Sequence, residues 1–72
     1  METKKEKFVR VAESRTNKII SMIRLLGNCS NRAAYEYSEK DIKKIFNAIE
    51  AELKAAKGKF FETTEPSAKF KL

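Results

Sequence analysis

The sequence predicts an all-α fold, a two-helix antiparallel hairpin with helices at about residues 4–26 and 39–60. Charged residues make up 36% of the 72 residues, and only one proline and two glycines occur, so the turn residues that an all-β fold needs are scarce. Apolar residues recur every three or four positions in both segments, which is the spacing of one helix face. The segment between them is rich in Asn and Ser and predicts an ordered loop of about ten residues.

The first helix is predicted by an apolar stripe at the period of 3.6 residues per turn. The stripe consists of Phe8, Ala12, Thr16, Ile19, Ile23 and Leu26. Glu6 and Arg10 are four residues apart and favour an ion pair on the helix surface. Gly27 follows the stripe at the C′ position, where a left-handed glycine commonly ends a helix. We therefore expect the helix to end at or near Leu26.

The second helix has a clear start signal. Ser38 is a favourable N-cap, and Asp41 three residues later completes a variant of the capping box. Tyr37 and Ile42 are spaced to pack together as a hydrophobic staple. The apolar stripe that follows consists of Ile42, Ile45, Phe46, Ile49, Leu53, Ala56 and Phe60. Gly58 interrupts the pattern, so the end of this helix is the least defined.

The loop and the C-terminal segment complete the predicted organisation. We expect loop residues 27–37 to fold over the open end of the hairpin, with Tyr35 covering the core and room for a helical turn at residues 31–35. Residues 1–61 form the predicted helical domain. Residues 62–72 contain Thr, Pro and Ser without a helical period and predict a flexible tail.

A second copy of the chain is predicted because a 72-residue domain buries little apolar surface and needs a supplement. Cys29 is the only cysteine, so an internal disulfide is impossible, and the absence of histidine makes a zinc site unfavourable. Association with another chain is the supplement that remains. The apolar arc of the first helix covers about half its circumference, and Val9 and Ile20 extend it beyond the roughly 100° that one partner helix covers. We expect a homodimer that forms a four-helix bundle.

A flank of small residues on the second helix is a further candidate interface. It consists of Ala48, Ala51 and Ala55, beside Lys44. Small side chains allow another helix to approach closely, but alanine is also the best helix former on a solvated face. Both interpretations remain open.

The positive charge lies mostly in the first helix and the loop after it. Residues 4–32 have a charge of +6, residues 33–72 only +1, and Glu2 brings the total to +6. The polar face of the first helix consists of Lys7, Arg10, Ser14, Asn17, Lys18, Ser21 and Arg24. Cations alternating with small hydrogen-bonding side chains suit a phosphate backbone, although a basic face can also be simply solvated.

We therefore predict a small non-enzymatic protein that binds nucleic acid, either RNA or DNA. Lys7, Arg10, Lys18 and Arg24 would contact phosphates, Asn17 would orient the backbone, and Arg32 in the loop would add a cation. The alternative is a protein-interaction module, an adaptor or inhibitor that uses Val9 and Ile20 or the alanine flank. An accessory domain without activity of its own is a third interpretation.

Other residues give weaker signals. Arg15 falls inside the apolar arc, where a guanidinium either reaches water or pairs with Glu52 or a loop carbonyl. Cys29 is expected to be a small half-buried residue, since no second cysteine or histidine accompanies it. Glu50 and Glu52 are two residues apart and face different directions on a helix, so they form no carboxylate pair. The sequence therefore predicts no enzyme and no cofactor.

The predicted location is the cytoplasm. A lone thiol fits a reducing compartment, and no apolar run has the length of a signal peptide. No segment is apolar enough over a sufficient length to span a bilayer. We therefore expect no membrane partner.

Three sequence runs carry a resemblance. They are R-x-N-K at residues 15–18, R-L-L-G-N-x-S-N at residues 24–31 and Y-E-Y-S-x-x-D-x-K-K-I-F at residues 35–46. With them the chain resembles a set of small uncharacterised bacterial proteins from chromosomes and mobile elements, over about residues 8–57. The resemblance implies a bacterial cytoplasmic setting and gives no substrate, cofactor or partner. As a fold, a basic dimerising hairpin is also similar to small plasmid-encoded RNA-binding bundle proteins, whose paired first helices contact nucleic acid.

Overall fold

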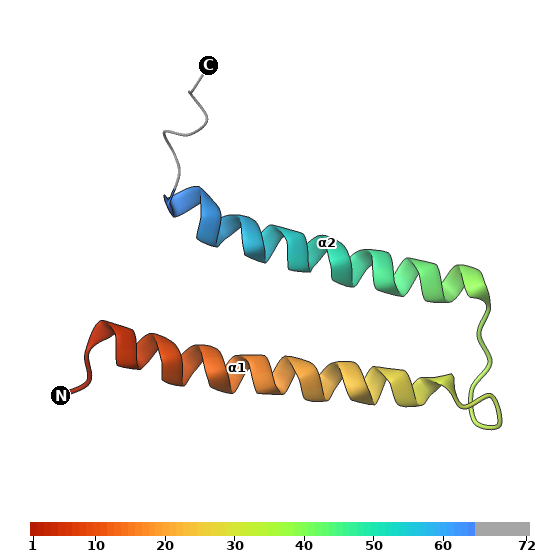
Figure 1. The fold of residues 1–72 in the computed structure, drawn as a ribbon. Coiled ribbons are helices and arrows are strands. Elements are labelled where there is room, and N and C mark those ends of the chain that lie inside the picture. Colours follow the sequence, from red (N-terminus) through yellow and green to blue (C-terminus); the bar gives the residue numbers. More distant parts are fainter. Residues whose placement is uncertain (65–72) are drawn as a thin grey trace, which may run out of the picture. The chain divides into compact units, whose positions relative to one another are not determined.

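The chain consists of two long helices joined by a structured loop (Figure 1). The computed structural model describes the backbone of residues 1–64 and the side chains of residues 1–61. The helices are α1 (Lys4–Gly27) and α2 (Glu39–Thr64), and the described residues contain no strand. The predicted all-α class with two long helices is therefore confirmed. The pairing of the helices and the four-helix bundle stay predictions.

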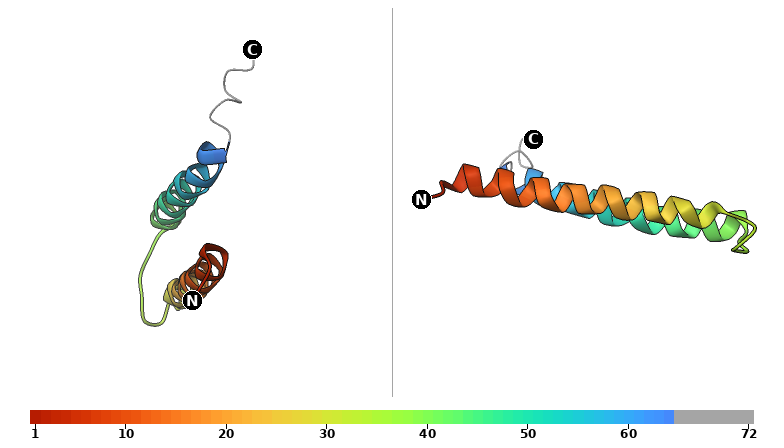
Figure 2. Two further views of the ribbon diagram at one scale, coloured as in Figure 1. Left: turned by 90° about the vertical axis from the view of Figure 1, so that its left-hand side faces the viewer. Right: turned by 90° about the horizontal axis from the view of Figure 1, so that it is seen from below.

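The chain divides into two compact units, Met1–Glu36 and Tyr37–Leu72, and each is described by itself. The first unit holds α1 and a short 3₁₀ helix, η1 (Asn28–Ser30). The second unit holds α2. The views in Figure 2 show α1 and α2 each running without a break.

α1 starts at Lys4, the predicted position, and a capping box that was not predicted fixes this start. The backbone N–H of Thr3 donates to Oε1 of Glu6 at 2.8 Å, and the N–H of Glu6 donates to Oγ1 of Thr3 at 3.0 Å. The N–H of Lys7 donates to the carbonyl of Thr3 at 2.9 Å, which adds the first helical hydrogen bond. Two N–H groups that a helix start leaves unpaired are thus satisfied by side chains.

The end of α1 differs from the expected left-handed glycine. Gly27 has φ −59° and ψ −30°, which is right-handed, so the expectation of a left-handed C′ residue is wrong. The N–H of Asn28 lies against the carbonyls of Arg24, Leu25 and Leu26 and leads into the 3₁₀ turn. Because this tighter turn satisfies the last carbonyls, the helix needs no left-handed residue to end. The helix therefore ends one residue later than predicted.

The loop contains the short turn predicted at residues 31–35. The carbonyl of Asn31 accepts from the N–H of Ala34 at 3.1 Å and from that of Tyr35 at 3.0 Å. The side-chain Oδ1 of Asn31 also accepts from the N–H of Ala33 at 3.0 Å. Tyr35 is exposed over 53% of its surface, so the expected role in covering a core is not seen.

Ser38 and Asp41 start α2 as predicted. The N–H of Ser38 donates to Oδ2 of Asp41 at 2.9 Å, and the N–H of Asp41 donates to Oγ of Ser38 at 3.1 Å. The helix passes through Gly58 and reaches Thr64, four residues beyond the expected end. Residues 65–72 of the predicted flexible tail lie outside the described residues. Gly58 does not take a positive φ, so it continues the right-handed helix instead of ending it.

None of the described residues is buried. The half-buried apolar side chains are Val11, Ala12 and Leu26 in the first unit and Tyr37, Ile42 and Ile49 in the second. Other members of the predicted stripes are open to solvent, such as Ile19 at 58% and Leu53 at 58% of their surface. Each helix thus presents an apolar face that its own unit does not enclose.

Candidate nucleic-acid interface

The polar face of α1 presents most of the predicted phosphate-binding residues. Lys7, Asn17, Lys18 and Arg24 are all exposed. At 100° per residue they lie within one arc of α1 that also contains Ser14 and Ser21. The apolar arc occupies the other side of the helix. The structure thus keeps the cations and the hydrogen-bonding side chains on one surface of one rigid element.

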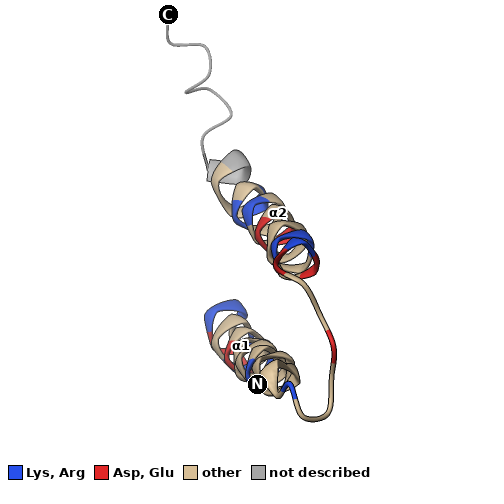
Figure 3. Ribbon diagram, turned by 90° about the vertical axis from the view of Figure 1, so that its right-hand side faces the viewer, with Lys and Arg blue, Asp and Glu red and all other residues tan. Residues whose placement is uncertain are grey.

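The two helices differ in how their charges are distributed. In Figure 3, where Lys and Arg are blue and Asp and Glu are red, α2 shows both colours. The acidic residues of its described side chains are Glu39, Asp41, Glu50 and Glu52, and residues 53–61 contain three lysines. On α1 the polar face has no acidic residue between Glu13 and Gly27. Lys18 and Arg24 lie in this stretch and form no ion pair within the described residues of the first unit. Their charge is available to an anionic partner.

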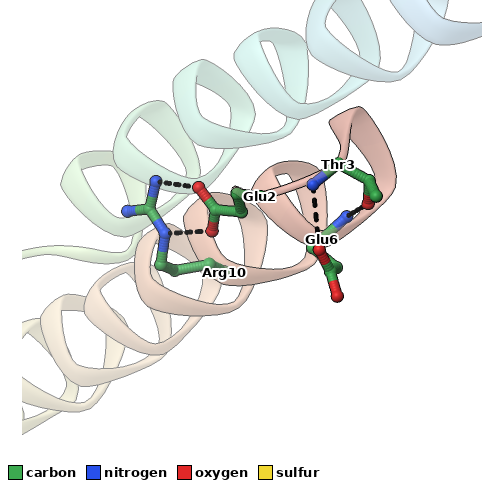
Figure 4. A network of polar contacts seen from close by, with 4 residues as sticks. All are labelled: Glu2, Thr3, Glu6 and Arg10. Carbon is green, nitrogen blue, oxygen red and sulfur yellow. Dashed lines mark hydrogen bonds and ion pairs between the residues drawn. The ribbon is translucent and has the colours of Figure 1, made fainter.

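Arg10 already has a partner. Its Nε donates to Oε2 of Glu2 at 2.8 Å and its Nη2 donates to Oε1 of Glu2 at 3.1 Å (Figure 4). The Glu2 carboxylate raises the pKa of Arg10 above its ordinary value. Glu6 was the expected partner, but its carboxylate serves the capping box with Thr3 instead. The ion pair is exposed on both sides, at 62% and 38% of the side chains, so a phosphate can compete for Arg10.

An open depression lies on the surface of α1 beside the predicted orienting residue. It is lined by Asn17, Lys18, Ser21 and Met22. The side chains of Asn17, Lys18 and Ser21 are therefore neighbours on the surface of α1. This group offers one cation and two neutral hydrogen-bonding groups, which is the combination that fixes a phosphate backbone in position.

The remaining sequence candidates are accessible but lie elsewhere. Arg32 is exposed in the turn after η1. Cys29 is also exposed, so the expectation of a half-buried cysteine is wrong, and the 3₁₀ turn that carries it explains the difference. Arg15 is exposed and has no ion pair within the described residues of the first unit, so it reaches solvent from the apolar arc.

The residues proposed for a protein interface are exposed as well. Val9 and Ile20 have 47% and 41% of their surface accessible. Ala48, Ala51 and Ala55 are exposed on α2. Exposure is required of an interface and equally expected of a solvated face, so the two interpretations of the alanine flank stay open.

Sequence reasoning missed Glu2 and Thr3. The run T-x-x-E at residues 3–6 is a capping-box signal and could have identified Thr3. No spacing rule could have identified Glu2, because its approach to Arg10 depends on the extended backbone of Thr3, with φ −78° and ψ 167°. The extended segment brings the Glu2 carboxylate beside the second turn of α1 (Figure 4).

The described residues show no group of three or more His, Cys, Asp or Glu that could hold a metal ion. Within that part of the chain, neither helix combines the length and apolar character needed to cross a bilayer. Comparison with known proteins gives no match to any family model, curated protein or solved structure. The case for a function therefore depends on the chemistry of the α1 surface.

Proposed function

We propose that the chain is a non-enzymatic protein that binds RNA or DNA through the polar face of α1. The observation that supports this proposal is the exposed row of Lys7, Lys18 and Arg24 on one helix, with Asn17 and Ser21 between them. The setting would be the cytoplasm, where the exposed thiol of Cys29 stays reduced.

The spacing of these cations suits a nucleic-acid backbone. Lys7 and Arg24 are 17 residues apart, which corresponds to roughly 26 Å along a helix. One strand of duplex DNA rises past about seven or eight phosphates in that distance, at 3.4 Å for each along the axis, while it winds about three quarters of a turn. A straight helix therefore meets only the phosphates that face it. The three cations are spread along this length and can contact separate phosphates, and each contact would release condensed counterions.

The neutral side chains would give the contact its orientation. Asn17 and Ser21 border the same depression as Lys18. An amide and a hydroxyl can each donate a hydrogen bond to a phosphate oxygen, and such contacts set the register of a protein on the backbone without reading the base sequence. We therefore expect binding that depends strongly on salt and weakly on sequence.

A matched pair of charge reversals tests the proposal. Lys18→Glu changes the polar face of α1, whereas Lys54→Glu makes the same change of net charge on α2. Fluorescence anisotropy with a labelled DNA duplex and a labelled RNA hairpin should show about tenfold weaker binding for Lys18→Glu and little change for Lys54→Glu. Equal losses in both variants would show that only net charge matters and would contradict a binding face on α1.

The exposed apolar residues favour one other function, that of a protein-interaction module. This function is favoured by the exposure of Val9 and Ile20, whose side chains remain accessible in the first unit. In that case replacing Val9 and Ile20 with Ser would abolish capture of a partner protein, and Lys18→Glu would leave the capture unchanged. The two functions use different sides of α1, so these variants separate them.

A further inference from the structure

The apolar residues of α2 form one main stripe, whereas those of α1 form two. In α2 the apolar positions alternate in steps of three and four, which is the pattern of a helix with one packing direction. They are Ile42, Phe46, Ile49, Leu53, Ala56 and Phe60, with Ile45 beside them in the same arc. Phe61 and the alanine flank lie outside this main stripe. A helix of this kind needs one partner, because a neighbouring helix covers an arc of roughly 100°.

The first stripe of α1 contains no charge from Val9 onward and is named here the uncharged stripe. Lys5, four residues before Val9, lies in line with it at the start of the helix. The stripe follows the same alternating spacing over almost the whole helix. Its members are Val9, Ala12, Thr16, Ile19, Ile23 and Leu26. Val9, Ile19 and Ile23 have 47%, 58% and 48% of their surface accessible. The uncharged stripe is therefore an apolar surface without a cover in its own unit.

The second stripe lies beside the first and contains Arg15, so it is named the Arg15 stripe. It consists of Phe8, Val11, Arg15 and Met22, and Lys18 borders it. At 100° per residue the centres of the two stripes are about 80° apart on the helix. One α2 stripe can cover only one of them, and the other requires a second partner.

We propose that the uncharged stripe of α1 binds the same stripe of a second copy of this chain, with the two helices antiparallel about a two-fold axis close to Thr16. Two-fold dimers are the commonest protein assemblies, and they require a surface that is complementary to itself. The uncharged stripe is complementary to itself in two respects. Its small residues would face its large ones, and charges of opposite sign would face each other at one border.

The sizes of the residues match when the stripe is turned onto itself. Thr16 lies next to the middle of α1, which runs from Lys4 to Gly27. In an antiparallel pair centred there, Val9 faces Ile23 of the second copy. Ala12 faces the larger Ile19 and Ile20, so small side chains oppose large ones. The two Thr16 hydroxyls meet at the axis, where each can donate to or accept from the other.

The charges also favour the uncharged stripe over the Arg15 stripe. Arg15 is equally close to the middle of α1, so self-pairing of its stripe would place two guanidinium groups opposite each other at the axis. Desolvating like charges side by side is strongly unfavourable. At the other border of the uncharged stripe, antiparallel pairing brings Glu6 near Arg24 of the second copy. This pair would be exposed, so a phosphate can compete for Arg24, as it can for Arg10. Lys7 and Lys18 remain outside the contact.

The small size of the chain favours a second copy over an unrelated protein. A domain of 72 residues has a marginal core even when compact, and association is one of the usual supplements. No described residue is buried in the single chain. A second copy is present wherever the protein is made, and it supplies a matching uncharged stripe.

The mass in solution tests this interface with a matched pair of variants. Thr16→Arg puts two cations at the proposed axis, whereas Ser14→Arg adds the same charge on the polar face. Sedimentation equilibrium at micromolar concentration should give the mass of two chains for the wild-type protein and for Ser14→Arg, and the mass of one chain for Thr16→Arg. A one-chain mass for the wild type, or a two-chain mass for Thr16→Arg, would overturn the proposal.

Disulfide cross-linking tests the geometry even if Thr16→Arg fails to fold. In a Cys29→Ser background, Thr16→Cys should form a disulfide between copies on mild oxidation, and Val9→Cys alone should not. A mixture of Val9→Cys and Ile23→Cys chains should cross-link, because these positions face each other only in the antiparallel pair. Cross-linking of Val9→Cys to itself would contradict the antiparallel axis.

Other occupants of the stripe would give different results. Binding of a one-chain species to vesicles of anionic phospholipid, with loss of binding in Ile19→Ser, would assign the stripe to a lipid surface and overturn the proposal. A one-chain mass that increases only when another protein is added would also overturn the proposal, because the stripe would then bind that protein and not a second copy of this chain.

Discussion

The two helices begin in the same way but differ in the surfaces they present. Thr3 with Glu6 and Ser38 with Asp41 form equivalent capping boxes, with hydrogen bonds of 2.8 to 3.1 Å. α1 has two apolar stripes and a net charge of +5 (seven Lys or Arg, two Glu), whereas α2 has one main apolar stripe and a net charge of +1 (six Lys, five Asp or Glu). Similar local signals therefore build both helices, and the distribution of side chains around each helix separates their roles.

In our proposals α1 carries the binding surfaces, because it has the larger excess of apolar and basic surface. A helix with one apolar stripe and balanced charge has what it needs to pack on one neighbour and to stay soluble. A helix with two apolar stripes and a basic face has more apolar and charged surface than one neighbouring helix can cover. The excess on α1 is the basis for both proposals, nucleic-acid binding by the polar face and self-association by the uncharged stripe.

The largest expected effect comes from reversing two charges on each helix. The double variant Lys18→Glu with Arg24→Glu should bind a DNA duplex about 100-fold more weakly, because it removes two phosphate contacts and adds two repulsive charges. The double variant Lys43→Glu with Lys54→Glu makes the same change of net charge on α2. Anisotropy titrations at one salt concentration should show little loss for the α2 variant, and similar losses in both would remove the distinction between the helices.

The capping boxes give the next largest effect. Thr3→Ala and Ser38→Ala should each lower the free energy of unfolding by about 1 kcal/mol, since each leaves a backbone N–H at the helix start without its side-chain acceptor. Ser14→Ala in the middle of α1 is the control and should change stability little. Urea denaturation followed by circular dichroism measures all three, and a neutral Ser38→Ala would show that its hydrogen bonds with Asp41 contribute nothing.

The sequence predicted the start of α2 better than the end of either helix, for a physical reason. At Ser38 and Asp41 the capping side chains are local and chemically specific, so the start of α2 could be identified from four residues. At Gly27 the sequence permits either a left-handed end or a 3₁₀ continuation, and the choice depends on which N–H reaches the last carbonyls. The N–H of Asn28 does so, and η1 follows.

Part of the candidate site could also be predicted from the sequence, and part could not. The helical period alone places Lys7, Lys18 and Arg24 on one face of α1. The engagement of Arg10 with Glu2 could not be predicted, because it depends on the path of the residues before the helix. The wide apolar arc of α1 was evident from the sequence, but its division into two stripes required the helix to run unbroken from Lys4 to Gly27.

Replacing the two glycines should have a smaller effect on stability. Gly27 tests a helix end, and Gly58 tests a helix interior. Gly27 and Gly58 both lie in right-handed helix, and an added Cβ would meet nothing within 4 Å at either position. Gly27→Ala and Gly58→Ala should therefore each raise the free energy of unfolding by about 0.5 to 1 kcal/mol. Urea denaturation checks this, and destabilisation by Gly27→Ala would support the left-handed end that the structure does not show.

Releasing Arg10 should give the smallest effect. Glu2→Gln removes the carboxylate that pairs with Arg10, so the guanidinium becomes available to a phosphate. Affinity for a DNA duplex at low salt should rise about two- to fivefold, the range expected when an exposed ion pair is lost. Glu36→Gln raises the net charge by the same amount in the loop and should leave the affinity unchanged. An unchanged affinity in Glu2→Gln would show that Arg10 lies outside the contact.

The salt dependence of binding tests the central claim most directly. If Lys7, Lys18 and Arg24 each neutralise one phosphate, a plot of log affinity against log salt concentration for duplex DNA should have a slope of about −2.7 per chain, at 0.9 for each phosphate. Lys18→Glu should reduce the slope by about 0.9. An affinity for nucleic acid that does not change between low and moderate salt would contradict binding through the polar face of α1.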